Sequence, residues 1–163
     1  MTIPPTDQNV HPPRLSNKPH NLHRKKKKKI TNYHLTNPVT LHEALRTPSS
    51  IPIAYPYHID GQKDLSQIGD AAIRLVLVTD GYDAQATRGQ ITEIHITTAN
   101  NRYLARTGFR KGLDGFLYGS FPGDIVPDRV MATTVEAILG AVYVDSGESM
   151  GAGRRVGVAW LIL

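Results

Sequence analysis

The sequence predicts an all-α domain that follows a disordered, basic N-terminal arm, and three stretches support this prediction. Val130–Gly147 places apolar residues at steps of three and four, the spacing of a helix with one face in a core. Leu65–Ile73 is a second apolar stretch of helical character. Residues 1–38 are rich in Pro, Asn, His and Lys, so they cannot bury enough apolar surface to fold alone. We therefore assign residues 1–38 to the arm and residues 39–163 to the domain.

Charge is distributed unevenly along the 163 residues, whose formal net charge is +5. Residues 1–30 contain eight Lys or Arg side chains and one acid, whereas the rest of the chain has 11 basic and 13 acidic residues. The high pI therefore belongs to the arm, and the folded part is slightly acidic. Its net charge gives no support to an RNA-binding surface on the domain itself.

Six consecutive basic residues lie in the arm: Arg24, Lys25, Lys26, Lys27, Lys28 and Lys29. Such a run is typical of a nuclear-import signal or of an RNA-binding arm that contacts phosphates. The alternative is a solvated tail whose charges repel one another. A block of Lys with many prolines is less typical of a mitochondrial presequence, so both the nucleus and the mitochondrion stay open as locations.

The composition argues against two other classes of protein. There is no cysteine, which excludes disulfides and thiolate metal sites. No apolar run approaches the length of a membrane span, and the first residues lack the apolar region of a secretory signal. We therefore expect no membrane partner.

The first half of the domain is predicted to contain a short helix, an irregular segment and a long helix. Val39–Arg46 follows an Asn-Pro pair, which is a typical helix start. Thr47–Gly61 contains three prolines that exclude a regular helix, and its alternating apolar residues predict an extended segment: Ile51, Ile53, Tyr55 and Tyr57. Asp64–Thr79 is predicted to be a long helix ended by an Asp-Gly pair. Its β-branched part, Ile73–Val78, fits a buried strand equally well.

The second half of the domain is predicted to be helical around one long loop. Ile91–Ala105 is a helical segment that continues through Tyr103–Lys111. Gly115–Asp128 is a loop rich in Gly and Pro that leads into the apolar helix, and Gly151–Leu163 is predicted to contain a last short helix. His95 lies among isoleucines, which is more typical of a partly buried histidine than of a metal ligand.

Each of the two apolar helices carries one acid in an otherwise apolar or small run: Asp70 in the first and Glu136 in the second. The simpler interpretation of one acid in a helix is a solvated or ion-paired side chain. However, an unpaired carboxylate among apolar helices is costly. Two acids on helices that pack together could share a divalent cation, because hard cations prefer carboxylate oxygens.

Four blocks of the sequence resemble the ribonuclease III domain family, in the order and with the separation that the family shows. The most specific block has the form Leu-x-x-Ile-Gly-Asp-Ala-Ala-Ile, similar to the family's signature helix Leu-Glu-Phe-Leu-Gly-Asp-Ala-Val-Leu. The blocks are Leu41–Ser49, Leu65–Ile73, Asn100–Ala105 with Gly112–Asp114, and Glu136–Gly147. The resemblance covers residues 39–160 and is greatest to short single-domain fungal members.

This resemblance implies a ribonuclease III-like helical domain, which favours helix over strand, and an endoribonuclease that hydrolyses double-stranded RNA with Mg²⁺. In the family each of two helices provides a pair of carboxylates. Asp70 and Glu136 match two of these positions and are the implied catalytic metal ligands, whereas Ser66 and Thr133 occupy the other two. Asp64 lies on a different face of its helix and is a poor substitute. Because hydroxyl groups bring no charge, we expect weak cation binding and weak or absent activity.

The resemblance also implies a homodimer, although Gln67 replaces the aromatic residue that the family uses in its subunit contact. A second hypothesis is a non-catalytic module that binds RNA or assembles with a partner, as ribonuclease III-like domains of ribosomes do. No double-stranded-RNA-binding domain is recognisable in the sequence. Since duplex RNA is recognised largely through shape and phosphate contacts, the Arg24–Lys29 run is the predicted RNA-binding element.

Overall fold

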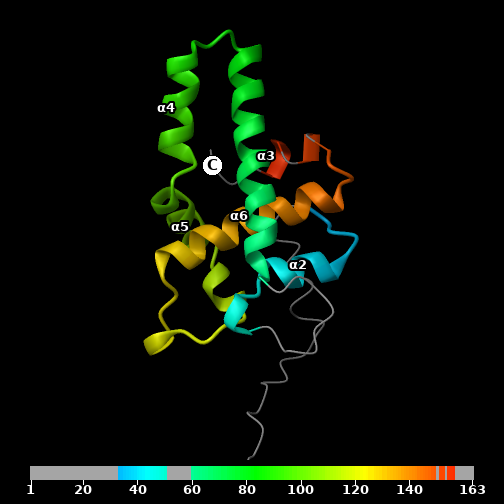
Figure 1. The fold of residues 1–163 in the computed structure, drawn as a ribbon, viewed down its shortest axis with the longest axis vertical. Coiled ribbons are helices and arrows are strands. Elements are labelled where there is room, and N and C mark those ends of the chain that lie inside the picture. The colour runs from blue at the N-terminus through cyan, green and yellow to red at the C-terminus, as the bar shows by residue number, and fades with distance from the viewer. Residues whose placement is uncertain (1–32, 51–59, 150, 153, 157–163) are drawn as a thin grey trace, which may run out of the picture.

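The computed structural model describes residues 33–50, 60–149, 151–152 and 154–156. Its α-helices are α2 (Pro38–Ala44), α3 (Gln62–Asp83), α4 (Arg88–Thr98), α5 (Asn101–Arg110) and α6 (Asp128–Asp145), and its 3-10 turns are η1 (Pro48–Ser50), η2 (Leu113–Phe116) and η3 (Pro122–Asp124). Within these residues the regular structure is helical, apart from one isolated bridge that pairs Arg46 with Tyr118. The predicted all-α fold is confirmed. In Figure 1, α3 and α4 form a projecting antiparallel hairpin, and α6 crosses α3 near the base of that hairpin.

Helix α6 is the centre of the hydrophobic core, as its apolar spacing predicts. Met131, Val135, Ile138 and Val142 lie on the buried faces of this helix and are almost completely inaccessible to solvent. Helices α2, α3 and α5 all pack against α6. The core therefore fixes how each of these helices is oriented around α6.

Two glycines allow α3 and α6 to cross with their backbones in contact. A Cβ atom on Gly69 would overlap the backbone carbonyl oxygen of Glu136, and a Cβ on Gly140 would overlap the carbonyl oxygen of Leu65. A backbone carbonyl cannot rotate away as a side chain can, so any larger residue would force the helices apart. At this crossing the two helices therefore meet backbone to backbone.

Helix α3 is longer than the sequence predicts, and its β-branched part is helical. The expected stop at Asp80-Gly81 is wrong, because the helix continues to Asp83. Gly81 is buried instead, and the side chain of Ile91 on α4 occupies the space that a Cβ would need. This glycine serves close packing between the two helices of the hairpin, whereas its sequence context suggested a turn.

The predicted continuous helix from residue 91 to 111 is also wrong, because it is broken into α4 and α5. Asn100 lies at the break and satisfies backbone groups of both helices. Its side-chain oxygen accepts a hydrogen bond from the Tyr103 amide (2.8 Å), and its amide group donates to the carbonyl oxygens of Ile96 (2.8 Å) and Thr97 (3.0 Å). One side chain thus ends α4 and starts α5, since asparagine is among the strongest N-cap residues.

Helix α2 is tied to α6 by Asp145, the final residue of α6. The Asp145 carboxylate accepts hydrogen bonds from the backbone amides of Thr36 (2.8 Å) and Asn37 (2.7 Å) and from the Thr36 hydroxyl (2.8 Å). Asn37 in turn caps α2 by accepting from the Val39 amide. Residues 33–37 lie within the predicted arm, and in the structure they contact the helical domain.

Several predictions fall on residues near the limits of the description. The expected extended segment, with Ile51, Ile53, Tyr55 and Tyr57, and the basic run Arg24–Lys29 lie outside the described residues. Residues 151–152 and 154–156 are helical, and Arg154 forms ion pairs with Asp80 and, at 3.8 Å, with Asp83. Across the described residues, none of the helices has the length and apolar character needed to cross a membrane.

Replacement of Gly140 with Ala should destabilise the fold, because the new methyl group would overlap a fixed carbonyl oxygen on α3. We expect a loss of about 1–3 kcal/mol in the free energy of unfolding, despite the better helix propensity of alanine. Gly89→Ala on exposed α4 is the matched control and should be neutral or stabilising. Urea denaturation measures both, and equal stability of the two variants would contradict the proposed contact.

Candidate active site

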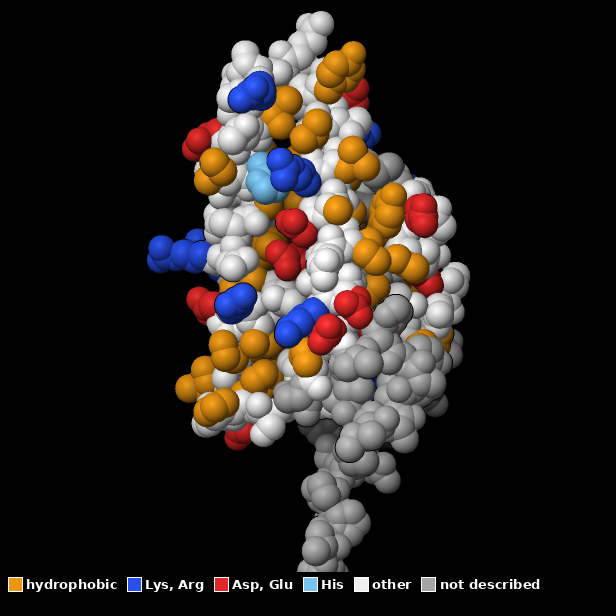
Figure 2. Space-filling view, viewed as in Figure 1, with side chains coloured by type: hydrophobic (Ala, Val, Ile, Leu, Met, Phe, Trp, Pro, Cys, Tyr) orange, Lys and Arg blue, Asp and Glu red, His pale blue; other side chains and the backbone are white. Residues whose placement is uncertain are grey.

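The crossing of α3 and α6 places the two predicted acids beside each other. Asp70 directly follows Gly69, and the carbonyl oxygen of Glu136 lies against that same glycine. The Asp70 side chain is exposed, whereas that of Glu136 is partly buried. Figure 2 shows acidic side chains grouped next to α3 at this point of the surface. The structure therefore brings together the two residues that the sequence singled out.

The pKa of Glu136 is raised by its surroundings at the crossing. Burial is the larger cause and the negative charge of Asp70 the smaller one; together they raise the pKa of Glu136 from 4.5 to about 7. At neutral pH Glu136 therefore carries a proton for a substantial part of the time. A bound cation would relieve both causes, since it would replace lost hydration and offset the like charges.

The two hydroxyl residues lie on the same helices but add little to this site. Ser66 is buried and donates a hydrogen bond to the Lys63 carbonyl oxygen (2.8 Å), so its proton is directed to its own helix. Thr133 is partly buried. It lies one helical turn before Glu136, a spacing at which side chains share a face. Both positions can approach the acid pair, but neither brings a charge to it.

A buried polar contact next to the site was not predicted from the sequence. Thr134 is fully buried, and its hydroxyl donates to the Val130 carbonyl oxygen (2.8 Å) and lies 3.1 Å from Oε1 of Gln62. Gln62 is also buried, at the first residue of α3. This contact fixes the start of α3 against α6, and therefore supports the register that places Asp70 near Glu136. A glutamine at a helix start gives no sequence signal of burial, which explains why it was missed.

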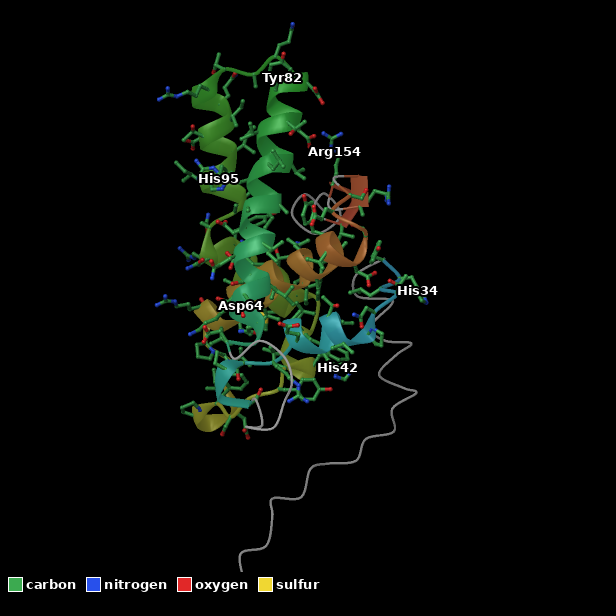
Figure 3. The ribbon with its side chains drawn as sticks, turned by 45° about the vertical axis from the view of Figure 1, so that its right-hand side comes forward. His34, His42, Asp64, Tyr82, His95 and Arg154 are labelled. Carbon is green, nitrogen blue, oxygen red and sulfur yellow. The ribbon has the colours of Figure 1, made fainter. Side chains whose placement is uncertain are left out.

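Other candidate ligands do not extend the acid pair. Asp64 lies in the first turn of α3, and Figure 3 shows it near one end of that helix with Tyr82 at the other. His95 is partly buried on α4, and its Nε2 has no hydrogen-bond partner within the described residues. In the part of the chain that the structure describes, no three His, Cys, Asp or Glu side chains gather into a potential metal site.

The donor set is compatible with a single Mg²⁺ ion. Mg²⁺ keeps several waters and is held in proteins by one or two carboxylates together with substrate phosphates. Asp70 and Glu136 supply that minimum, with one carboxylate from each helix. They do not supply the denser set of charges that a tightly held ion or a pair of ions needs.

Comparison with known proteins gives consistent results. The ribonuclease III domain family matches residues 63–147, which is more than half of the chain. A curated protein of Shewanella sediminis named ribonuclease 3 is 32% identical over 91 residues, covering 51% of this chain. The chain spans about 40% of that relative's length.

Solved structures show the same fold. Two structures of the nuclease domain of ribonuclease III from Campylobacter jejuni align with TM-scores of 0.69 at 19% sequence identity. The first covers 85% of this chain and 99% of that domain, and the second covers 84% and 92%. In the first of these structures, a region of the nuclease domain that is involved in dimer formation is structurally flexible.

The raised pKa of Glu136 predicts a stability that falls as pH rises. The folded state holds the proton more tightly than the unfolded state, so the contribution is complete below pH 4.5 and is lost as pH rises through about 7. In EDTA, we expect the free energy of unfolding of the wild type to fall by about 1–2 kcal/mol between pH 5 and pH 8 as Glu136 ionises, a figure that allows for the partial exposure of this side chain. Glu136→Gln should lack this dependence, and Glu93→Gln, at an exposed position on α4, should retain it. Superimposable pH profiles for wild type and Glu136→Gln in urea denaturation would refute the shift.

Proposed function

Because the chain belongs to the ribonuclease III domain family, we propose that it acts on double-stranded RNA through the Asp70–Glu136 pair, with hydrolysis that is weak or lost. The observation that carries this proposal is the interaction of the two carboxyl groups across the α3–α6 crossing. Asp70 and Glu136 would hold Mg²⁺, which would supply Lewis acidity for the attacking water and positive charge for the phosphate.

The protein's own groups have distinct parts in this proposal. Glu136 is the partly buried ligand of the pair, and it would release its proton when a cation binds. Asp70 is exposed and therefore open to a phosphodiester at the surface. Ser66 and Thr133 leave the site with half of the carboxylates that the family uses, and affinity for hard cations depends on ligand charge. Weak cation binding is the physical reason for expecting weak hydrolysis.

A non-catalytic module that binds RNA or assembles with a partner is the second candidate. The orientation of Ser66 favours it, since its hydroxyl is already engaged with the Lys63 carbonyl oxygen. In this case the acid pair is a remnant of a fuller site, and RNA binding does not depend on Mg²⁺.

Restoring the missing carboxylates tests the site directly. The variant Ser66→Glu/Thr133→Asp should place four acids at one crossing, which would repel strongly without a cation. We expect a lower Tm than wild type in EDTA and a larger rise on Mg²⁺ addition, by several degrees, together with at least a tenfold gain in cleavage of duplex RNA.

Two controls make this test decisive. Adding Asp70→Ala or Glu136→Ala to the restored variant should abolish both the Mg²⁺-dependent Tm rise and the cleavage. Wild-type cleavage that disappears in the same single alanine variants would support the enzyme, and RNA binding without any cleavage would support the non-catalytic module. A restored variant with no Mg²⁺ response would show that Ser66 and Thr133 are not the vacant ligand positions.

We also propose that the domain forms a homodimer through an exposed apolar face of α3. Side chains on this face recur at the spacing of a helix-to-helix seam, seven and three to four residues apart. They are Ile68 (37% exposed), Leu75 (48%), Val78 (44%) and Tyr82 (80%). Gln67 is exposed on the same part of the helix. An apolar stripe of this length on a surface helix commonly marks a protein interface.

Replacement of Leu75 with Glu should convert the dimer to a monomer without loss of folding, because the side chain is already half exposed. Light scattering coupled to size exclusion measures the mass. Ile96→Glu, at an exposed apolar position on α4, is the matched control and should remain dimeric. A wild-type chain that is monomeric at high concentration would overturn this part of the proposal.

A further inference from the structure

Helix α5 carries a local excess of positive charge that the rest of the domain does not share. Asn101–Lys111 contains Arg102, Arg106, Arg110 and Lys111 and no acid, although the chain after residue 30 has more acidic than basic residues. The three arginines are exposed and lie four residues apart. They form one row along the helix, with steps of about 6 Å. We call Arg102, Arg106 and Arg110 the arginine row.

The helix dipole favours a cation only at Arg110, in the last turn of α5, and the described fold gives no such reason for Arg102 and Arg106. Leu104, Ala105, Thr107 and Gly108 form the buried face of α5, on the side opposite the row. None of the described acidic residues forms an ion pair with any of the three arginines. Like charges four residues apart on a helix repel each other and destabilise it. Arg102 is also in the first turn, where the helix dipole disfavours a cation.

The next residue shows how crowded this positive charge is. Lys111 follows Arg110 at the end of the helix, and burial, then the charge of Arg110, lowers the pKa of its ammonium group. Arg110 and Lys111 therefore repel each other at the end of the helix. Such a surface is stabilised when an anion of matching spacing binds to it.

Helix α5, which carries the row, packs directly on α6, the helix that carries Glu136. Gly108 of α5 packs so closely on α6 that a Cβ would meet the side chains of Met131 and Val135, and Val135 is the neighbour of Glu136. Figure 2 shows basic side chains projecting from the edge of the molecule that α5 forms. The row thus sits on the outer face of α5, about one helix diameter from α6.

We propose that the arginine row binds the phosphodiester backbone of duplex RNA and holds it beside the α3–α6 crossing. This inference rests on the proposed function, because it takes its ligand from there. Arginine is suited to the contact, since its planar fork makes two parallel hydrogen bonds to a phosphate and keeps its charge at any cellular pH. The arginine row thus gives the domain contacts to phosphates, although the net charge of the domain is slightly negative.

The test measures binding, so it does not depend on cleavage. Fluorescence anisotropy with a fluorescein-labelled RNA duplex, in EDTA and over a range of KCl concentrations, gives the affinity and its salt dependence. For the full chain, Arg102→Gln/Arg106→Gln/Arg110→Gln should weaken binding at least tenfold and reduce the slope of log K against log salt by about 2 to 3. Its Tm should be equal to or above that of wild type, because repulsion along α5 is relieved.

Matched variants separate a local site from general charge. Arg88→Gln/Arg129→Gln/Arg155→Gln removes the same charge from exposed positions on three other segments, and should change the slope by less than one. Arg102→Lys/Arg106→Lys/Arg110→Lys should keep most of the slope of log K against log salt, because the charges are retained. It should lower the affinity, because lysine lacks the planar guanidinium that binds a phosphate through two hydrogen bonds. Equal effects of the two glutamine variants would overturn the proposal, as would a wild-type slope in the row variant.

The remaining outcomes distinguish this inference from the proposed function. If wild type binds duplex RNA and the row variant binds equally well, the row is not an RNA site, and the proposed function stands with the Arg24–Lys29 run as its contact. If wild type does not bind duplex RNA even at low salt, both proposals fail, and the row is a solvated face or a site for an acidic protein.

Discussion

The contact between Gly69 and Gly140 is the constraint on which the rest of this structure depends. Two helices can cross at backbone distance only where both lack side chains, and here each glycine faces a carbonyl oxygen of the other helix. The apolar side chains of α6 close the core around this point. Asp70 and Glu136 flank the same contact, so the geometry of the site is a direct result of helix packing. Any change that separates α3 from α6 separates the two carboxylates as well.

The chemistry of the acid pair explains how the domain can tolerate an incomplete site. Two like charges at a half-buried position repel, and a single proton on Glu136 relieves most of that repulsion when no cation is present. Four carboxylates at the same crossing would need a cation to be stable. Under the proposed function, Ser66 and Thr133 would lower the affinity for a cation and, at the same time, make the fold less dependent on one. The domain would then gain stability without a cation and lose catalytic capacity, a common relation between stability and function.

How much could be predicted from the sequence depended on whether the signal was periodic or local. The spacing of apolar residues in α6 predicts its buried faces. The presence of one acid in each of two apolar helices predicts the pair formed by Asp70 and Glu136. The break at Asn100 was missed because a single capping side chain interrupts no apolar pattern. Gly81 was misread because a glycine that ends a helix and one that admits a neighbouring side chain look identical in sequence.

The polar partners could not be predicted because they are set by tertiary contacts. Gln62 and Thr134 are 72 residues apart, and nothing near either residue indicates that the two meet. The same holds for Asp145, which is separated by more than 100 residues from the backbone amides that donate hydrogen bonds to it. The arginine row is visible as spacing in the sequence, but its exposure and its lack of ion pairs with described acids emerge only from the packing of α5.

The two acids near the middle and the end of α6 respond to protons in opposite directions. Burial alone would raise the pKa of Asp145, but hydrogen bonds from Asn37 and Thr36 outweigh it and lower that pKa. Acid therefore weakens the attachment of α2 to α6, whereas alkali charges Glu136 inside the crossing. Without a metal ion, α6 is held best in a mildly acidic interval between these two limits. An ion at the crossing would widen that interval toward neutral pH. The same ion that the proposed reaction needs would then also stabilise the packing of α3 on α6.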